Sequence, residues 1–432
     1  MACFLLKDDV FRFAVSREAP YYTAQVVQGT RSYRLSARPA RGVDDTAFVA
    51  EYRVPRREGV PAVLNAPQEF LHAVNPEWSV PDGACQQWHF HPRHGWLNDP
   101  NGLFFRDGKW HVFYQYNPLG VAWENMHWGH AVSTDLYHWS HLPVALYPDD
   151  WGTMYSGSAV LDADGCAGFG KDALLLFYTN AAYASSQGTQ CLAFSIDGGA
   201  TFHKYNDGLP IIGNMTLDRD RDPNIAWDAA AGVWRLALYF GASSTKSRFG
   251  LFESQNLLSW TPTDVFEIPG GAECPGLRPM VDEATGRTRW LFFEASGRYR
   301  VGDISRDGRI RFDRSEVRRF LYGIPYAGQC FVGAPDGKTV YLAWLRMKPA
   351  PERQWTGCFS CPMELRLRDG ELLVRPYLPP VKGEAAPLKE YLDEVPDGAE
   401  GQGLVLRDTF TAEYFDAAER FVVAIPSDKP SA

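Results

Sequence analysis

Most of the chain is a succession of short apolar runs, rich in β-branched and aromatic residues, that are separated by Gly, Pro, Asp and Asn. Apolar positions at helical spacing are scarce over long windows, and 39 Gly with 30 Pro supply many turns. Short apolar runs between turn residues are typical of β-strands rather than helices. The pattern therefore predicts an all-β protein.

One unit, an apolar strand, a polar turn and a second apolar strand, recurs five times. The units begin at residues 99, 156, 222, 274 and 327, so that 57, 66, 52 and 53 residues separate successive starts. Most are followed by a strand that ends in Ser, then Asp or Asn, then an aromatic residue, as in HAVSTDLYHW (130–139). Five units of four strands predict a five-bladed β-propeller. A set of sandwich hairpins with accidental similarity is the alternative.

The two flanks of the chain do not share this repeat. Residues 1–82 alternate in the manner of strands and end in a Pro-rich stretch, and residues 381–432 contain two further apolar runs. A tail of about 50 residues is short for a hydrophobic core of its own. We therefore expect the N- and C-terminal strands to form an accessory β-sandwich beside a five-bladed propeller of residues 83–380.

Composition excludes several classes of function. The net charge is −9 and no run of Lys and Arg occurs, which argues against nucleic acid and against anionic membranes as partners. No window holds 18 uninterrupted apolar residues, as a spanning helix requires. The apolar start is broken at Lys7, too early for a signal peptide, and the eight Cys are scattered, so we expect a cytoplasmic protein.

Acidic residues stand at, or directly before, the start of three of the five repeat units: Asp99, Asp222 and Glu273. Equivalent positions on the innermost strands of a propeller converge at one mouth of its channel, so these carboxylates should face one another. Crowding of like charges raises at least one pKa, which leaves a protonated acid beside an ionised nucleophile. That is the chemistry of glycosidic bond cleavage. The alternative for each, a cap on a turn before Pro, is less suited to three matching positions.

The motifs WLNDPNG (96–102), RDP (221–223) and ECP (273–275) resemble the three signatures of glycoside hydrolase family 32, which comprises invertases, inulinases, levanases and sucrose-6-phosphate hydrolases. The stretches 127–139 and 155–160 match as well, and the similarity covers residues 88–380. The resemblance implies a five-bladed propeller with a β-sandwich that cleaves β-D-fructofuranosyl linkages with retention of configuration. It leaves open whether sucrose, its 6-phosphate or a fructan is the natural substrate.

By motif position, the resemblance makes Asp99 the nucleophile, Glu273 the acid/base and Asp222 the residue that binds fructose hydroxyls. The residues expected to bind the sugar are Asn98, Gln115, Trp123, Tyr155, Ser156, Arg221 and Tyr326. No metal and no cofactor are expected, the partner is a fructose-containing oligosaccharide, and the oligomeric state stays open. A fructosyltransferase with the same trio and a catalytically silent fructan-binding protein are the alternatives.

Overall fold

The computed structural model describes residues 2–6, 10–15, 22–37, 48–53, 60–66, 73–74, 88–243, 245–349 and 353–377. Within them nearly all regular structure is β-strand. The helical segments are two 3₁₀ turns, η2 (Tyr205–Gly208) and η3 (Pro335–Gly337). None of the helices in these ranges is long and apolar enough to span a membrane.

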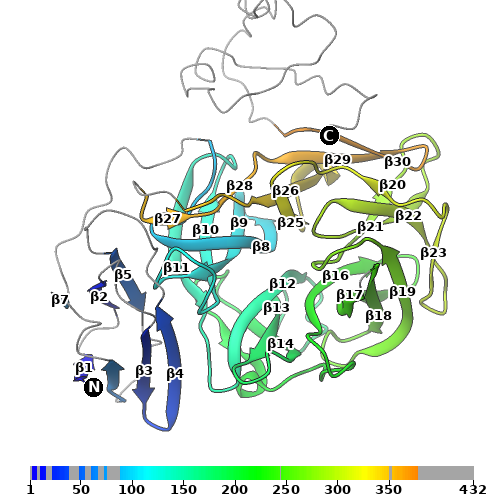
Figure 1. Cartoon of the computed structure of the whole chain (residues 1–432). Coiled ribbons are helices and arrows are strands. Elements are labelled where there is room, and N and C mark those ends of the chain that lie inside the picture. Colours follow the sequence, from blue (N-terminus) through cyan, green and yellow to red (C-terminus); the bar gives the residue numbers. More distant parts are fainter. Residues whose placement is uncertain are drawn as a thin grey trace, which may run out of the picture. The chain divides into compact units, whose positions relative to one another are not determined.

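Five antiparallel sheets follow one another along the chain and surround a common centre (Figure 1). Blade 1 is β8 (Gly95–Arg106), β9 (Lys109–Asn117), β10 (His127–Ser133) and β11 (Trp139–Leu146). Blade 2 is β12 (Gly152–Asp162), β13 (Ala173–Ala182), β14 (Gly188–Ser195) and β15 (His203–Lys204). Blade 3 is β16 (Arg221–Asp228), β17 (Val233–Ala242), β18 (Lys246–Ser254) and β19 (Thr261–Pro269).

Blades 4 and 5 each carry one extra short strand. Blade 4 is β20 (Gly276–Val281), β21 (Thr288–Phe293), β22 (Arg298–Ile304) and β23 (Ile310–Phe312), with β24 (Arg318–Arg319) also paired to β22. Blade 5 is β25 (Pro325–Cys330), β26 (Thr339–Leu345), β29 (Met363–Arg368) and β30 (Glu371–Pro376), with β28 (Cys358–Phe359) also paired to β26. The predicted five-bladed propeller is confirmed, with each predicted unit starting at or beside a blade's first strand.

The first strand of each blade is the innermost one. β12 packs against both β8 and β16, β16 packs against β20, and β25 packs against β8. The ring is closed between blades 5 and 1, where β27 (Trp355–Thr356) pairs in parallel with the start of β8. Val332, just after β25, adds two backbone hydrogen bonds, to Leu103 and Phe105. The closure holds the inner strands at fixed positions around the channel.

The recurring Ser-x-Asp/Asn pattern has a local structural cause. At the end of β10, the Ser133 hydroxyl accepts the backbone N–H groups of Asp135 and Leu136, while Asp135 Oδ1 accepts those of Tyr137 and His138. These side chains take up backbone donors that the turn leaves unpaired. The same contacts recur at Ser254 and Asn256 in blade 3. The pattern therefore marks the turn from the third to the fourth strand.

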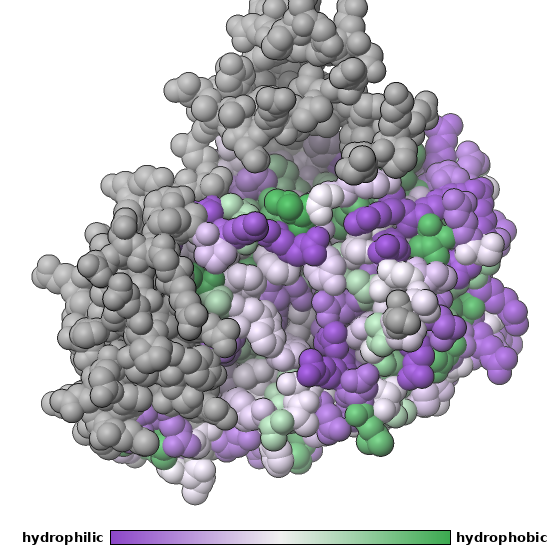
Figure 2. Space-filling model, viewed as in Figure 1, coloured by the Kyte–Doolittle hydropathy of each residue, from purple (hydrophilic) through white to green (hydrophobic). Residues whose placement is uncertain are grey.

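The hydrophobic core lies between neighbouring blades. Four clusters of buried side chains join blades 1 and 2, 2 and 3, 3 and 4, and 4 and 5. Aromatic residues fill them, and Phe104, Phe177 and Phe249 are fully buried, which accounts for much of the high aromatic content. On the face shown in Figure 2 the described residues are mostly hydrophilic, and the hydrophobic ones are scattered.

The described N-terminal residues form two small sheets. One consists of β1 (Ala2–Leu6), β6 (Ala62–Ala66), β3 (Tyr22–Gln28) and β4 (Arg31–Ala37), and the other of β5 (Phe48–Arg53), β2 (Val10–Val15) and β7 (Ala73–Val74). Residues 381–432 lie outside the described ranges. The sandwich shared by both termini, and the domain boundaries drawn from it, stay predictions.

Candidate active site

The predicted site residues lie at irregularities that recur near the start of the inner strands. Register shifts fall between Leu97 and Pro100 in β8, between Tyr155 and Gly157 in β12, and at corresponding places in β16 and β25. A β-bulge bends its strand and redirects the side chain at the extra residue. Asp99, Ser156 and Asp222 all lie within such shifts. The Asp-Pro and Ser-Gly dipeptides of the sequence thus mark places where side chains leave the regular pleat.

The backbone at Asp222 and Cys274 is in an unusual conformation. Their φ angles are 66° and 52°, in the left-handed region that side chains with a Cβ rarely adopt. Asp222 is held there partly by Thr179, whose hydroxyl accepts its backbone N–H at 2.9 Å. Such conformations persist only where surrounding contacts fix them. The fold therefore orients these two residues firmly.

Asp99 accepts hydrogen bonds on both carboxylate oxygens. Asn98 donates to Oδ1 at 3.1 Å, and the Ser156 hydroxyl donates to Oδ2 at 2.7 Å. The Cys274 thiol lies 3.5 Å from the same Oδ2. Blades 1 and 2 and the start of blade 4 therefore converge on one carboxylate, which is fixed in orientation.

Cys274 also joins Asp99 to Asp222. Its Sγ lies 3.5 Å from Asp222 Oδ2, and its backbone N–H donates to that oxygen at 3.1 Å. Burial first, then the neighbouring carboxylates, raise the pKa of the Cys274 thiol well above its usual range. The thiol therefore stays protonated and can donate to either carboxylate. One sulfur atom lies between two of the three predicted carboxylates.

Arg221 joins Asp222 to Glu273. Its Nε and Nη2 donate to Glu273 Oε2 at 3.0 and 2.6 Å, and Nε lies 3.6 Å from Asp222 Oδ2. The Tyr326 hydroxyl donates to the other oxygen of Glu273, Oε1, at 3.1 Å. Tyr239 lies under the Arg221 guanidinium, 4.5 Å from the ring centre. Through these contacts all three carboxylates belong to one network.

The electrostatics of the network follow from burial and crowding. Burial first, then the charge of Glu273, raise the pKa of Asp99 to about 6, against the opposing hydrogen bonds of Ser156, Asn98 and Cys274. Burial raises the pKa of Asp222 to about 7. The positive charge of Arg221 lowers this pKa, but the charges of Glu273 and Asp99 raise it, so Arg221 offsets only part of the increase. Asp99 and Asp222 therefore both titrate at a higher pH than free carboxyl groups do, because they are buried together.

The remaining predicted binding residues surround this network to different degrees. Gln115 is buried, and its amide donates to the Met154 carbonyl at 2.8 Å, which fixes the start of β12. Trp123 is 49% exposed and meets Tyr155 edge to face, with ring centres 5.6 Å apart. Asn98 is buried between Trp96 and Asp99. The exposed Trp123 is thus the better placed of these aromatic side chains to stack on a sugar.

Three contacts were missed when the sequence was considered alone. Cys274 is part of the ECP motif but had no role assigned to it, and Thr179 and Tyr239 belong to no motif. Cys274 could have been suspected, since it stands directly after the predicted acid/base. Thr179 and Tyr239 lie on second strands of blades 2 and 3, and only the pairing of strands brings them to the site.

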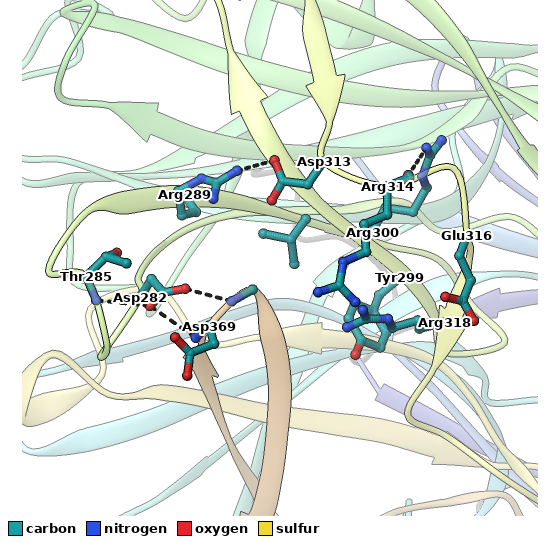
Figure 3. Close-up of a pocket in the computed structure, with 12 residues that line it drawn as sticks. Asp282, Thr285, Arg289, Tyr299, Arg300, Asp313, Arg314, Glu316, Arg318 and Asp369 are labelled. Carbon is teal, nitrogen blue, oxygen red and sulfur yellow. Dashed lines mark hydrogen bonds and ion pairs between the residues drawn. The ribbon is translucent and has the colours of Figure 1, made fainter.

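Another pocket, of about 280 Å³, lies between blades 4 and 5 and contains none of the trio (Figure 3). Its arginines mostly pair with nearby carboxylates: Arg289 with Asp313, and Arg318 with Glu371. Asp282 accepts the backbone N–H of Gly370 at 2.8 Å, across the seam between the blades. These contacts join the two blades. Among all the described residues, the pocket included, no group of three His, Cys, Asp or Glu is placed to hold a metal.

Removing the Ser156 hydroxyl should change the pH dependence of the site. Its hydrogen bond favours the ionised form of Asp99, so Ser156→Ala raises the Asp99 pKa further above about 6. We expect the acid limb of kcat/KM to move up by about half to one pH unit. The measurement is the pH profile of kcat/KM on a glycoside that the protein cleaves. Ser140→Ala, at an exposed position of β11, is the control, and an unshifted limb in Ser156→Ala contradicts the assignment.

Comparison with known proteins agrees with this geometry. Residues 89–376 match the family model described as the glycosyl hydrolases family 32 N-terminal domain. A levanase of Bacillus subtilis (strain 168) is 36% identical over 325 residues, covering 68% of this chain and 46% of the levanase. An invertase of Schizosaccharomyces pombe is 34% identical over 255 residues, covering 52% and 43%. The chain thus spans less than half the length of each of these relatives.

Solved structures are similar as well. A fructofuranosidase from Schwanniomyces occidentalis, complexed with fructose, aligns with a TM-score of 0.63 at 29% identity, covering 72% of this chain and 68% of that one. An exo-inulinase from Aspergillus awamori aligns with a TM-score of 0.59 at 27% identity, covering 68% and 67%. With five blades in sequence order, the three motifs in one network and a family match over two thirds of its residues, the chain belongs to glycosyl hydrolases family 32.

Proposed function

We propose that this protein hydrolyses β-D-fructofuranosyl linkages with retention of configuration. The observation that carries the proposal is the network itself: Cys274 Sγ lies 3.5 Å from both Asp99 and Asp222, and Arg221 links Asp222 to Glu273. Retaining glycosidases need a nucleophilic carboxylate and an acid/base carboxyl group on opposite sides of one bond. The relatives named levanase and invertase support fructosides as the substrate class.

In the first step, ionised Asp99 attacks the anomeric carbon of the fructosyl unit. The hydrogen bonds from Asn98 and Ser156 hold its two oxygens in place for that attack. Glu273 donates a proton to the leaving oxygen, and the bond between that oxygen and the anomeric carbon breaks. The products are a free alcohol and a fructosyl ester of Asp99.

In the second step, Glu273 acts as a base. It removes a proton from water, whose oxygen attacks the anomeric carbon and releases the ester, so Asp99 is again ionised and Glu273 is again protonated. Arg221 and Tyr326, which donate to the two oxygens of Glu273, stabilise it while it is ionised between the steps. The two inversions together give net retention.

Asp222 has a different role, to bind hydroxyl groups of the fructosyl ring. It is 6% exposed, and its Oδ2 accepts the Cys274 backbone N–H, which fixes its orientation. Hydrogen bonds from sugar hydroxyls to a carboxylate gain strength as charge develops on the ring. Burial raises its pKa to about 7, so both its protonated and its ionised form are present near neutral pH.

A substrate panel tests the proposal. Purified protein is incubated with sucrose, sucrose 6-phosphate, kestose, inulin and levan, and released fructose is measured. Release from at least one of these supports the proposal, and no release from any of them, by a folded protein, contradicts it. Product analysis at high sucrose separates hydrolysis from fructosyl transfer, because transfer yields longer oligosaccharides instead of free fructose.

The cytoplasmic location stays a prediction. The exo-inulinases among the relatives are named extracellular. Fractionation of cells that produce the protein, with activity measured in medium and lysate, tests the location directly.

A further inference from the structure

A cavity of about 1240 Å³ lies where the inner strands end, away from the carboxylate network. Its walls include the last residues of β12, β16 and β20. The carboxylate site instead uses Ser156 in the first half of β12, Asp222 near the start of β16 and Cys274 just before β20. Trp227 lies five positions after Asp222 on β16, so about 17 Å of extended strand separates the two. The cavity is therefore a separate feature at the other end of the channel.

The cavity presents an exposed tryptophan. Trp227 is 43% exposed, and its ring packs against that of Trp234 at 5.0 Å between centres, with a tilt of 59°. Nearby Val281, also on the wall, is 59% exposed. Exposed aromatic surface inside a concavity marks a binding site more often than scattered apolar residues do. Flat aromatic faces suit the C–H faces of sugar rings.

The cavity wall carries charges of both signs, with four arginines (Arg235, Arg278, Arg287 and Arg306) and three carboxylates (Asp228, Glu253 and Asp303). Asp228 and Glu253 both pair with Arg235, at 3.1 and 2.7 Å, and Asp303 lies 3.8 Å from Arg287. The wall therefore offers polar groups and aromatic surface with an excess of a single positive charge. A polyanion such as nucleic acid needs a larger excess, whereas an uncharged, hydroxyl-rich ligand needs none.

We propose that this cavity is a second binding site for fructan, one that holds an inner stretch of a polymeric substrate while a chain end occupies the carboxylate site. The inference rests on the proposed function, because it takes its ligand from the same class of substrate. The volume exceeds that of ordinary small-ligand pockets, roughly 300–1,000 Å³, and so has room for several sugar units. Binding of a polymer at one site raises its effective concentration at the other.

The test is a comparison of long and short substrates. In Trp227→Ala we expect KM for polymeric inulin or levan to rise about 3- to 10-fold, with kcat unchanged and with both constants for sucrose unchanged. Trp227→Phe keeps an aromatic face and should retain most of the effect. Val265→Ala removes an exposed apolar side chain from β19, the outer strand of the same blade, and serves as the matched control.

Direct binding gives an independent readout. In a Glu273→Gln protein, migration through native gels that contain inulin or levan should be retarded, and Trp227→Ala in that background should remove most of the retardation. The inference is overturned if Trp227→Ala leaves the retardation or the KM for polymers unchanged. It is also overturned if light scattering shows that Trp227→Ala changes the molecular mass of the protein, because Trp227 would then act in subunit association. Failure of the wild type to cleave sucrose or any fructan would contradict the proposed function instead, so the two failures are distinguishable.

Discussion

Asp99→Asn is expected to lower turnover of sucrose or fructan on the order of 10⁴-fold or more. The amide nitrogen and oxygen of asparagine cannot form the ester on which the two-step reaction depends. The side chain keeps its size, and its oxygen can still accept from Ser156, so binding should change little. The measurement is kcat and KM on the best substrate of the panel, with the exposed Asp164→Asn as the matched control.

The same variant should be more stable than the wild type at alkaline pH. The pKa of Asp99 is raised to about 6 in the folded protein, so the folded state favours the protonated form. The stability from that protonation is present at low pH and is lost as pH rises through about 6. Asparagine does not ionise, so the variant does not lose stability as the pH rises. We expect its free energy of unfolding to exceed that of the wild type by about 1–3 kcal/mol at pH 8, with a smaller difference towards pH 4. Thermal unfolding at both pH values measures it.

Wild-type activity in Asp99→Asn, after deamidation has been excluded by mass spectrometry, contradicts the nucleophile assignment. A variant that is equally stable at pH 8 and pH 4 relative to wild type contradicts the electrostatic description instead. The two results are independent, because the first concerns bond formation and the second concerns only the charge of a buried carboxylate.

Glu273→Gln is expected to lower kcat/KM for sucrose by about 10²–10⁴-fold, because the leaving oxygen departs without a proton. A fructosyl donor with a good leaving group, such as fructosyl fluoride, needs no such proton. With fructosyl fluoride, the rate constant of the first step should stay within about tenfold of the wild-type value. The second step should remain slow, because Glu273 is no longer present to remove a proton from water. Rapid-mixing kinetics should then show a burst of fluoride followed by slow steady-state turnover.

The exposed Glu316→Gln is the matched control, and it should behave as wild type with both donors. Equal losses on sucrose and fructosyl fluoride would mean that Glu273 acts through Arg221 and Tyr326 on the shape of the site, since both contact it. Such a result would show that Glu273 is not the group that donates the proton.

The fold was largely readable from the sequence because each blade repeats its local chemistry. Ser133 with Asp135 and Ser254 with Asn256 make the same turn contacts, so the pattern reports a structure that each segment forms by itself. The closing pair of β27 with β8 was not readable, because it joins residues 355 and 95 through a two-residue strand without a pattern.

The candidate site was partly readable for a related reason. Asp99, Asp222 and Glu273 could be found because they stand at matching positions of a repeat. The thiol of Cys274 between two carboxylates and the Thr179 hydroxyl beneath Asp222 could not, because they depend on bulges and on strand pairing. The cavity around Trp227 likewise appears only when the ends of three inner strands are brought together.

The most direct test of the account is the identity of the atom that receives the fructosyl unit. Glu273→Gln protein is incubated with fructosyl fluoride, quenched with acid and digested, and the peptides are analysed by mass spectrometry. The account predicts one added anhydrofructose unit on the peptide that contains Asp99, absent from the Asp99→Asn/Glu273→Gln double variant. A label on Asp222 or another residue, or burst kinetics with no labelled peptide, contradicts it.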